Sequence, residues 1–352
     1  MFILLYIFLI SIFFLFLKKI GRDVEYKYIY GFYRITNNLS FLQRISKLKI
    51  MSLFEYLSIP IGFLSMLAAI YFIFYGIQTR TPTVVPVIPG LEIYGIKFPI
   101  FEVIIAIFIS AFIHELFHAL LAIRNNIKIK SFGIFFFGPF LGAFVEPSDD
   151  IFQINKIKQI SIFNAGILAN ILLSLFIIVF FYFLGEYTNV FNQETYVYIV
   201  GKVPNVTNLE NITFSTNEKL LYIGNTEIRN IRDIEEALKS YSPGDNIEII
   251  TEKNIYNIKL SEKEGKPFIG LYFKQEVKFN MFYNILFWIL IISLGIALGN
   301  SLPIFTLDGG QALKALLSII VKDNRKVSIL HTLISYLILI ALFSNIFLLL
   351  RK

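Results

Sequence analysis

Two of the three histidines in this chain lie four residues apart, in the segment His114-Glu115-Leu116-Phe117-His118. Positions i and i+4 share one face of an α-helix, so both imidazole rings can reach one metal ion. Glu115 lies near the same cavity, where its carboxylate can take a proton from a water molecule. The spacing therefore indicates a zinc site that activates water. The alternative is a polar cluster that bonds neighbouring helices.

A zinc site with two histidines needs a third protein ligand and an open position for water. The chain has no cysteine, and a carboxylate oxygen is an acceptable ligand. Among the aspartates, only Asp308 adjoins the end of an apolar segment in a sequence that can turn inward, NSLPIFTLDGG (300–310). Its alternative role is to N-cap a helix over 309–321. The remaining His331 is expected to be an ordinary ring at the membrane interface, with a ligand role as the alternative.

The composition indicates a membrane protein. The chain has 352 residues, of which 56% are hydrophobic and 16% charged, whereas soluble domains are about 45–50% apolar and about 25% charged. That excess of apolar side chains could not all be buried in soluble cores of this size. The formal charge of +7 is typical of cytoplasmic loops rather than of nucleic-acid binding, so we expect a lipid bilayer and no nucleic acid as partner.

Apolar segments predict an α-helical polytopic membrane protein with six transmembrane helices. They cover about 2–17, 53–77, 101–123, 157–184, 281–299 and 328–350. Between the third and fourth, residues 131–147 (SFGIFFFGPFLGAFVEP) have Gly and Pro where a helix needs neither, and they are too apolar for an open loop. We expect a short strand pair or a re-entrant segment there, near the histidines.

Residues 186–279 contain no apolar run of that length and predict a small soluble α+β domain. Segments 219–223 and 246–250 alternate as strands do, and 232–241 predicts a short helix. The expected organisation has four parts: 1–100 with spans one and two and a basic segment, 101–185 with the histidine motif, the domain 186–279, and 280–352 with Asp308 and the last span.

The distribution of basic residues predicts the orientation. Segments 18–52, 124–158 and 311–327 hold 17 Lys and Arg residues, whereas the short segments on the other side, 78–100 and 351–352, hold four. The positive-inside rule then places both termini and the inserted domain outside, and the histidines toward the cytoplasmic side. For a chain this short we expect a prokaryotic cell membrane.

Three motifs in order resemble the site-2 protease family of intramembrane zinc metalloproteases: HELFH (114–118), FNAGILAN (163–170) and NSLPIFTLDGG (300–310). GPFLGAFVEP (138–147) is similar to the family's segment beside the active site. The resemblance covers about residues 101–321. It implies one zinc ion per chain, held by His114, His118 and Asp308.

The same resemblance assigns further roles. It implies Glu115 as the general base, Asn170 as a polar group near the reacting carbonyl, and Asn300 as a residue that shapes the turn before Asp308. Ile167 stands where the family usually has Pro, and we expect this to alter the helix bend but not the chemistry.

The activity that the resemblance implies is endopeptidase cleavage within the transmembrane segments of single-pass or otherwise membrane-anchored proteins, as in regulated intramembrane proteolysis. The alternative is a non-proteolytic metal-binding membrane protein, such as a zinc transporter or a scaffold. A transporter needs polar residues along a whole path, and a scaffold does not need Glu115.

The inserted domain resembles a PDZ domain. LYIGNTEI (221–228) is similar to the strand and turn of such domains, 233–238 to the following helix, SPGD (242–245) to the next turn, and Gly270 to the closing strand. The Gly-rich loop that binds a carboxylate is not found. Capture of a peptide end, a size filter and a docking surface therefore stay open as roles.

Overall fold

The computed structural model describes residues 12, 15–16, 18–19, 23–27, 30–35, 40–137, 140–185, 194–204, 209, 217–278 and 281–350. The chain divides into two compact units, one formed by residues 1–186 with 284–352 and the other by residues 187–283. Apart from residues 12, 15 and 16, the first expected span at 2–17 lies outside the described residues.

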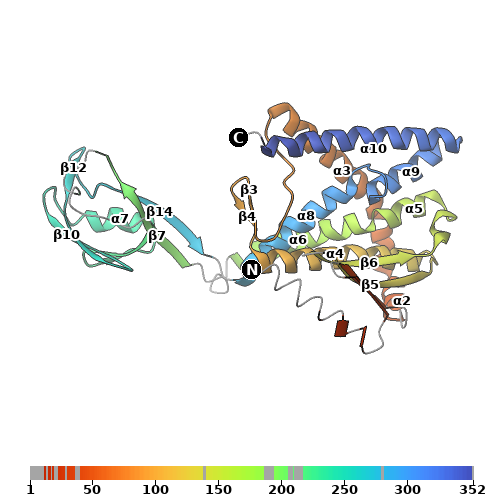
Figure 1. Cartoon of the computed structure of the whole chain (residues 1–352), viewed down its shortest axis with the longest axis horizontal. Coiled ribbons are helices and arrows are strands. Elements are labelled where there is room, and N and C mark those ends of the chain that lie inside the picture. The colour runs from red at the N-terminus through yellow and green to blue at the C-terminus, as the bar shows by residue number, and fades with distance from the viewer. Residues whose placement is uncertain are drawn as a thin grey trace. The chain divides into compact units, whose positions relative to one another are not determined.

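The first unit consists mainly of long helices, with a small β-sheet beside them (Figure 1). Its helices are α2 (Ser40–Ser46), α3 (Lys49–Thr79), α4 (Ile100–Arg124), η1 (Asp149–Phe152), α5 (Lys156–Phe163), α6 (Ala165–Gly185), α8 (Met281–Ser301), α9 (Asp308–Ile320), α10 (Asn324–Phe347) and η3 (Leu348–Leu350). The described part of the chain has five segments that are long and apolar enough to cross a membrane. They correspond to the second through sixth expected spans.

The fourth of the six expected spans is built from two helices. The apolar stretch Lys156–Phe183 is continuous in composition, but the helix breaks at Asn164, between α5 and α6. α6 packs against α3 and α4, while α5 packs against α9. The break therefore lies where α5 and α6 contact the helices that carry the candidate ligands.

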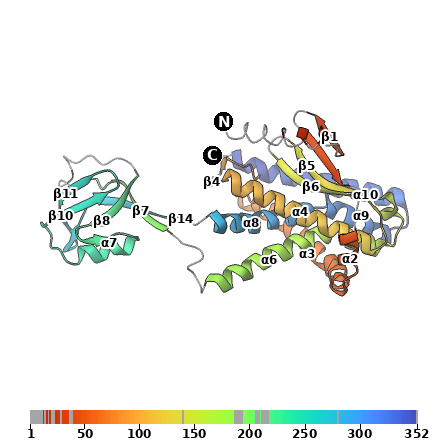
Figure 2. The same ribbon diagram turned by 90° about the horizontal axis from the view of Figure 1, so that it is seen from below.

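A four-stranded antiparallel sheet lies beside the helices. Its strands are β1 (Val24–Lys27), β2 (Tyr30–Ile35), β5 (Ile129–Phe137) and β6 (Phe140–Pro147), in the order β1-β2-β5-β6. β6 packs against α4, as Figure 2 shows. Of the two expected forms of segment 131–147, the strand pair is the one that is present.

Strands β1 and β2 come from the basic segment 18–52, for which the sequence analysis expected no strands. Aromatic contacts explain the pairing, since the ring of Phe32 stacks on Phe135 with centroids 5.8 Å apart and meets Phe144 edge-on at 5.7 Å. Such aromatic pairs contribute beyond the area that they bury.

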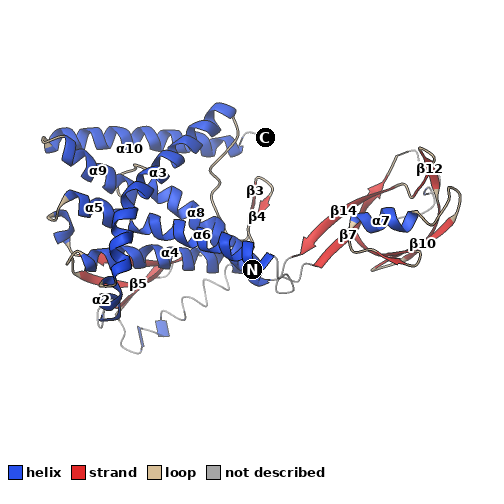
Figure 3. Cartoon of the chain, turned by 180° about the vertical axis from the view of Figure 1, so that it is seen from behind, coloured by secondary structure: helices blue, strands red, loops and turns tan. Residues whose placement is uncertain are grey.

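In its described residues the second unit has a β-sheet and a short helix (Figure 3). Its elements are β7 (Glu194–Lys202), β8 (Glu218–Ile223), β9 (Thr226–Glu227), α7 (Ile231–Leu238), β10 (Asn246–Thr251), β11 (Ile255–Lys259), β12 (Ser261–Lys263), β13 (Lys266–Phe268) and β14 (Leu271–Lys278). The main sheet has the order β11-β10-β8-β7-β14, with β9 paired to β8. Helix α7 begins at a capping box in which Asn230 and Asp233 bond each other's backbone.

One further hairpin lies in the first unit, between α3 and α4. It consists of β3 (Glu92–Ile93) and β4 (Ile96–Lys97), joined at Tyr94 and Gly95, which both have positive φ. It belongs to the Pro-rich stretch that separates two spans.

Candidate metal centre

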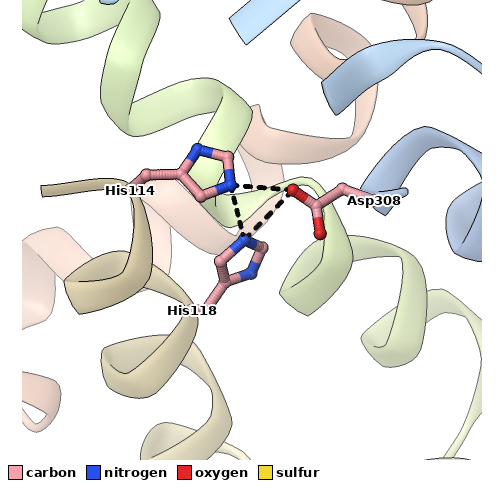
Figure 4. A group of neighbouring side chains, drawn as sticks. All are labelled: His114, His118 and Asp308. Carbon is pink, nitrogen blue, oxygen red and sulfur yellow. Dashed lines mark hydrogen bonds and ion pairs between the residues drawn. The ribbon is translucent and has the colours of Figure 1, made fainter. Parts of the chain in front are cut away.

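The two histidines of the HELFH motif project from α4 toward Asp308, the first residue of α9 (Figure 4). The Nε2 atom of His114 lies 2.8 Å from Oδ2 of Asp308, and the Nε2 atom of His118 lies 3.2 Å from the same oxygen. The two Nε2 atoms are 3.1 Å apart. Among the described residues, these three form a group whose donor atoms all lie within 4.8 Å of one another.

The start of α9 leaves the carboxylate of Asp308 free to face the histidines. The N-cap of α9 is Leu307, and no side chain caps the helix. Asp308 is therefore not the N-cap, which was the alternative role considered from the sequence. The helix starts one residue earlier than expected from the sequence.

A tight turn, residues 302–307, carries the chain from α8 to Asp308. The hydroxyl of Ser335 on α10 accepts a hydrogen bond from the Phe305 N–H at 3.0 Å and donates one to the Pro303 carbonyl at 3.1 Å. Leu302 and Ile304 are buried in one cluster with residues of α3 and α10. The position of Asp308 thus depends on α10, which contributes no residue to the donor group of the described residues.

The two glycines after Asp308 allow this turn to pack closely. A Cβ atom added at Gly309 would collide with the carbonyl oxygen of Ser301, and one added at Gly310 would lie 2.7 Å from the carbonyl oxygens of Ile304 and Phe305. The first turn of α9 therefore lies directly on the backbone of the preceding turn, and only glycine leaves room for it.

The Nδ1 atom of His118, the ring nitrogen that is not directed at Asp308, has a fixed partner. It lies 2.7 Å from the carbonyl oxygen of Ile162, so Nδ1 carries the proton and donates it. Ile162 belongs to the last turn of α5, where carbonyl oxygens have no i+4 N–H donor within the helix and can accept from a side chain. This contact leaves the Nε2 lone pair of His118 directed at the group, as a metal ligand requires.

Asn170 contacts the Nδ1 atom of His114, the ring nitrogen that is not directed at Asp308. Its amide lies 3.1 Å from Nδ1 of that ring, and its Oδ1 is buried without a hydrogen-bond partner in the described part of the chain. A half turn of the amide exchanges donor for acceptor, so Asn170 can serve either tautomer of His114. The structure thus gives Asn170 a contact to a ligand candidate, while its role at the reacting carbonyl remains a prediction.

The donor set fits zinc. A tetrahedron with zinc–nitrogen bonds of about 2.0–2.1 Å has edges of about 3.3 Å, and the three donor atoms are 2.8–3.2 Å apart. Gly166 at the start of α6 leaves the adjoining space open, because a Cβ atom there would lie 2.5 Å from the Nε2 atoms of both His114 and His118.

Glu115 contacts the sheet. Its Oε2 accepts a hydrogen bond of 3.2 Å from the backbone N–H of Val145 on β6. Because β6 is the last strand in the sheet order, this N–H points away from β5 and toward the centre. The carboxylate is therefore held between α4 and the free edge of the sheet.

The remaining candidates lie apart from the donor group. His331 is buried in α10 but is not part of it. Asn300 lies near the end of α8. Within the described residues the side-chain bonds to the following turn come from Ser335 and Gln311, so the shaping role of Asn300 stays a prediction. Ile167 is fully buried in α6, three residues after the helix break.

Sequence reasoning missed four contributors to this centre. They are Gly166, Val145, Ser335 and the carbonyl of Ile162. For Gly166 a signal was available, because it lies inside the motif FNAGILAN (163–170), between two asparagines. The other three act through backbone groups or across long sequence separations, where residue type alone carries no information.

Comparisons with known proteins place the chain among peptidases. Residues 102–342 match Peptidase family M50, which is more than half of the chain and includes all three donor residues. An uncharacterized protein of Methanocaldococcus jannaschii is similar, with 29% identity over 289 residues that cover 80% of this chain and 76% of the relative.

We predict that His118→Ala removes most of the bound zinc, because two remaining donors cannot hold the ion tightly. The matched control is His331→Ala, which changes a buried histidine of another membrane helix and should leave the zinc content near one ion per chain. The measurement is metal analysis of purified protein by mass spectrometry. Equal zinc loss in both variants would contradict the assignment.

A second prediction concerns the space beside the donors. Gly166→Ala should lower zinc content strongly, because the added methyl group collides with both Nε2 atoms. Gly295→Ala is the control, since a Cβ atom at this membrane-helix position meets nothing within 4 Å. Zinc titration followed by thermal unfolding compares the two, and undiminished zinc affinity in Gly166→Ala contradicts the geometry.

Proposed function

The chain belongs to peptidase family M50, the site-2 protease family, and is an intramembrane zinc metalloprotease; on this premise we propose that Glu115 is its general base. The zinc ligands in this proposal are His114, His118 and Asp308. The observation that carries it is the meeting of the α4 histidines with a carboxylate 190 residues away in the chain. This pairing brings the three ligands together beside Glu115 on α4, a helix long and apolar enough to cross a membrane.

Zinc held by His114, His118 and Asp308 would act as a Lewis acid toward the scissile carbonyl and would lower the pKa of a bound water. Glu115 takes the proton from the attacking water and passes it to the leaving amine. The Val145 N–H holds one oxygen of Glu115, which fixes the direction of the carboxylate. The carbonyl of Ile162 and the amide of Asn170 keep the two imidazoles oriented.

We also propose that β6 receives the substrate as an added strand. A helical substrate keeps its carbonyls in hydrogen bonds, so it must unwind before it can be cut, and an extended segment then needs new partners. Backbone groups alternate along a strand, so Ala143 shares the outward orientation of Val145. Strand addition to this edge would place a substrate backbone directly beside Glu115.

The inserted domain is proposed to be PDZ-like and extracytoplasmic, within the four-part organisation 1–100, 101–185, 186–279 and 280–352. Its support is a β-sheet with one helix that starts at a capping box, together with the basic segments at the opposite ends of the spans. A size filter for substrate ectodomains is one role that such a domain can serve. The proposed location is a prokaryotic cell membrane with both termini outside.

The substrates in this proposal are single-pass or otherwise membrane-anchored proteins, cut in regulated intramembrane proteolysis. A zinc transporter or scaffold, the alternative, has no use for a carboxylate held beside a sheet edge. The contact between Glu115 and Val145 therefore favours the peptidase role.

The functional test is cleavage of a single-pass reporter in proteoliposomes. Glu115→Gln keeps the size of the side chain but removes the base, so we expect a loss of cleavage of at least about 100-fold with unchanged zinc content. Glu102→Gln is the control, because Glu102 lies in the first turn of the same helix, far from the centre. Full cleavage by Glu115→Gln would overturn the proposal.

The depth of the centre predicts where substrates are cut. His118 and His114 lie six and ten residues before the end of α4 at Arg124, which places the donors about 9–15 Å from that end of the span. We expect cuts in the cytoplasmic half of a substrate span, at a stretch weakened by Gly, Pro, Asn or Ser. Mass spectrometry of the two fragments locates the bond, and cuts in the outer half would contradict the orientation or the depth.

A further inference from the structure

A polar cavity of about 880 Å³ lies where the first turns of α3 meet the last turn of α4 and the start of β5. Its lining also includes a residue of α5. None of the zinc ligand candidates lines it, and neither does Glu115. The cavity is therefore separate from the metal centre.

The charge of this cavity is strongly positive. Its charged residues are Lys47, Glu55, Arg124, Lys128 and Lys158, so four cations face one carboxylate. In the described part of the chain, the three lysines have no ion-pair partner. Four cations that line one cavity with a single carboxylate leave a site suited to an anionic ligand.

The single carboxylate is already engaged. Glu55 accepts from Nε of Arg124 at 3.1 Å through one oxygen and from the Asn125 amide at 2.9 Å through the other. Nη1 of Arg124 donates to the Ser46 carbonyl at 3.0 Å. These bonds hold the guanidinium in place before any ligand arrives, and they leave the lysines without a neutralising partner.

The level of the cavity relative to the membrane limits what can occupy it. α3 and α4 are both long enough to cross a membrane, and the cavity lies at the beginning of one and the end of the other. This is the depth of lipid headgroups. Apolar side chains are exposed close by on α3, its N-cap and α5, namely Leu48, Leu53 and Ile157.

We propose that this cavity binds the phosphate group of an anionic phospholipid. The four cations hold the phosphate, while the exposed apolar side chains lie against the acyl chains. A free anion has no acyl chains and would contact only the cations. Basic pockets between transmembrane helices on the cytoplasmic side bind such headgroups in general.

A bound lipid would join the helices that orient His118. Arg124 lies six residues after His118 on α4, and Lys158 lies four residues before Ile162, whose carbonyl holds the His118 ring. A phosphate shared by Arg124 and Lys158 therefore links α4 to α5 at one end. Binding should raise the unfolding temperature of the protein as well as retain the lipid.

The test uses the full chain in nanodiscs of phosphatidylcholine with phosphatidylglycerol, and native mass spectrometry counts the retained lipids. One variant replaces Lys47, Lys128 and Lys158 by Gln. The control replaces Lys314, Lys322 and Lys326 by Gln, which removes the same charge outside the cavity. Because each lysine contributes about fivefold to anionic lipid binding, the cavity variant should retain phosphatidylglycerol at least about tenfold less well than the control.

Two outcomes would overturn the proposal. One is equal retention of phosphatidylglycerol by the cavity variant and the control. The other is equal retention of phosphatidylcholine and phosphatidylglycerol by the unaltered protein, a comparison that does not depend on whether a variant folds. Inorganic phosphate is added in a further arm, and displacement of the lipid by millimolar phosphate would assign the cavity to a free anion instead.

Discussion

The arrangement depends on bringing the two imidazoles of α4, a helix long enough to cross a membrane, together with the carboxylate at the start of α9. Isolated polar and ionisable groups at such depth are costly unless they pair with one another. The two Nε2 atoms and Oδ2 of Asp308 lie within 3.2 Å of each other, so a cation bound between them would compensate all three groups. The helix break at Asn164 and the glycine at 166 are the local changes that make this approach possible.

Helix α10 satisfies backbone groups that irregular segments leave free. Ser335 bonds the turn before Asp308, and the amide of Asn345 accepts from the N–H groups of Thr83 and Val84 while donating to the Ile73 carbonyl. Irregular backbone at membrane depth is tolerated only where such partners exist. The last helix therefore stabilises two non-helical segments, the turn 302–307 and the stretch that follows α3, and the first of these leads directly to Asp308.

The parts that could be predicted from the sequence follow from local patterns. Helical periodicity put His114 and His118 on one face. Asp308 was singled out because, among the aspartates, it alone adjoins the end of an apolar segment in a sequence that can turn inward. Segment 131–147 excluded a helix by its Gly and Pro content. The strands at 24–35 were missed because β2 pairs with β5, about 100 residues away, and the alternation in Val24–Lys27 covers only four residues. The contact between Asn170 and His114 was missed because it joins two different helices, α6 and α4. The family resemblance assigned Asn170 a role but did not say which residue it contacts.

Zinc-edge X-ray absorption spectroscopy of the purified protein tests the central claim most directly, because it reports the ligand atoms around the ion. The account predicts a shell with two imidazole nitrogens and at least one carboxylate oxygen, which Asp308→Asn changes while His331→Ala does not. A shell with three imidazoles, or one that Asp308→Asn leaves unchanged, would contradict it.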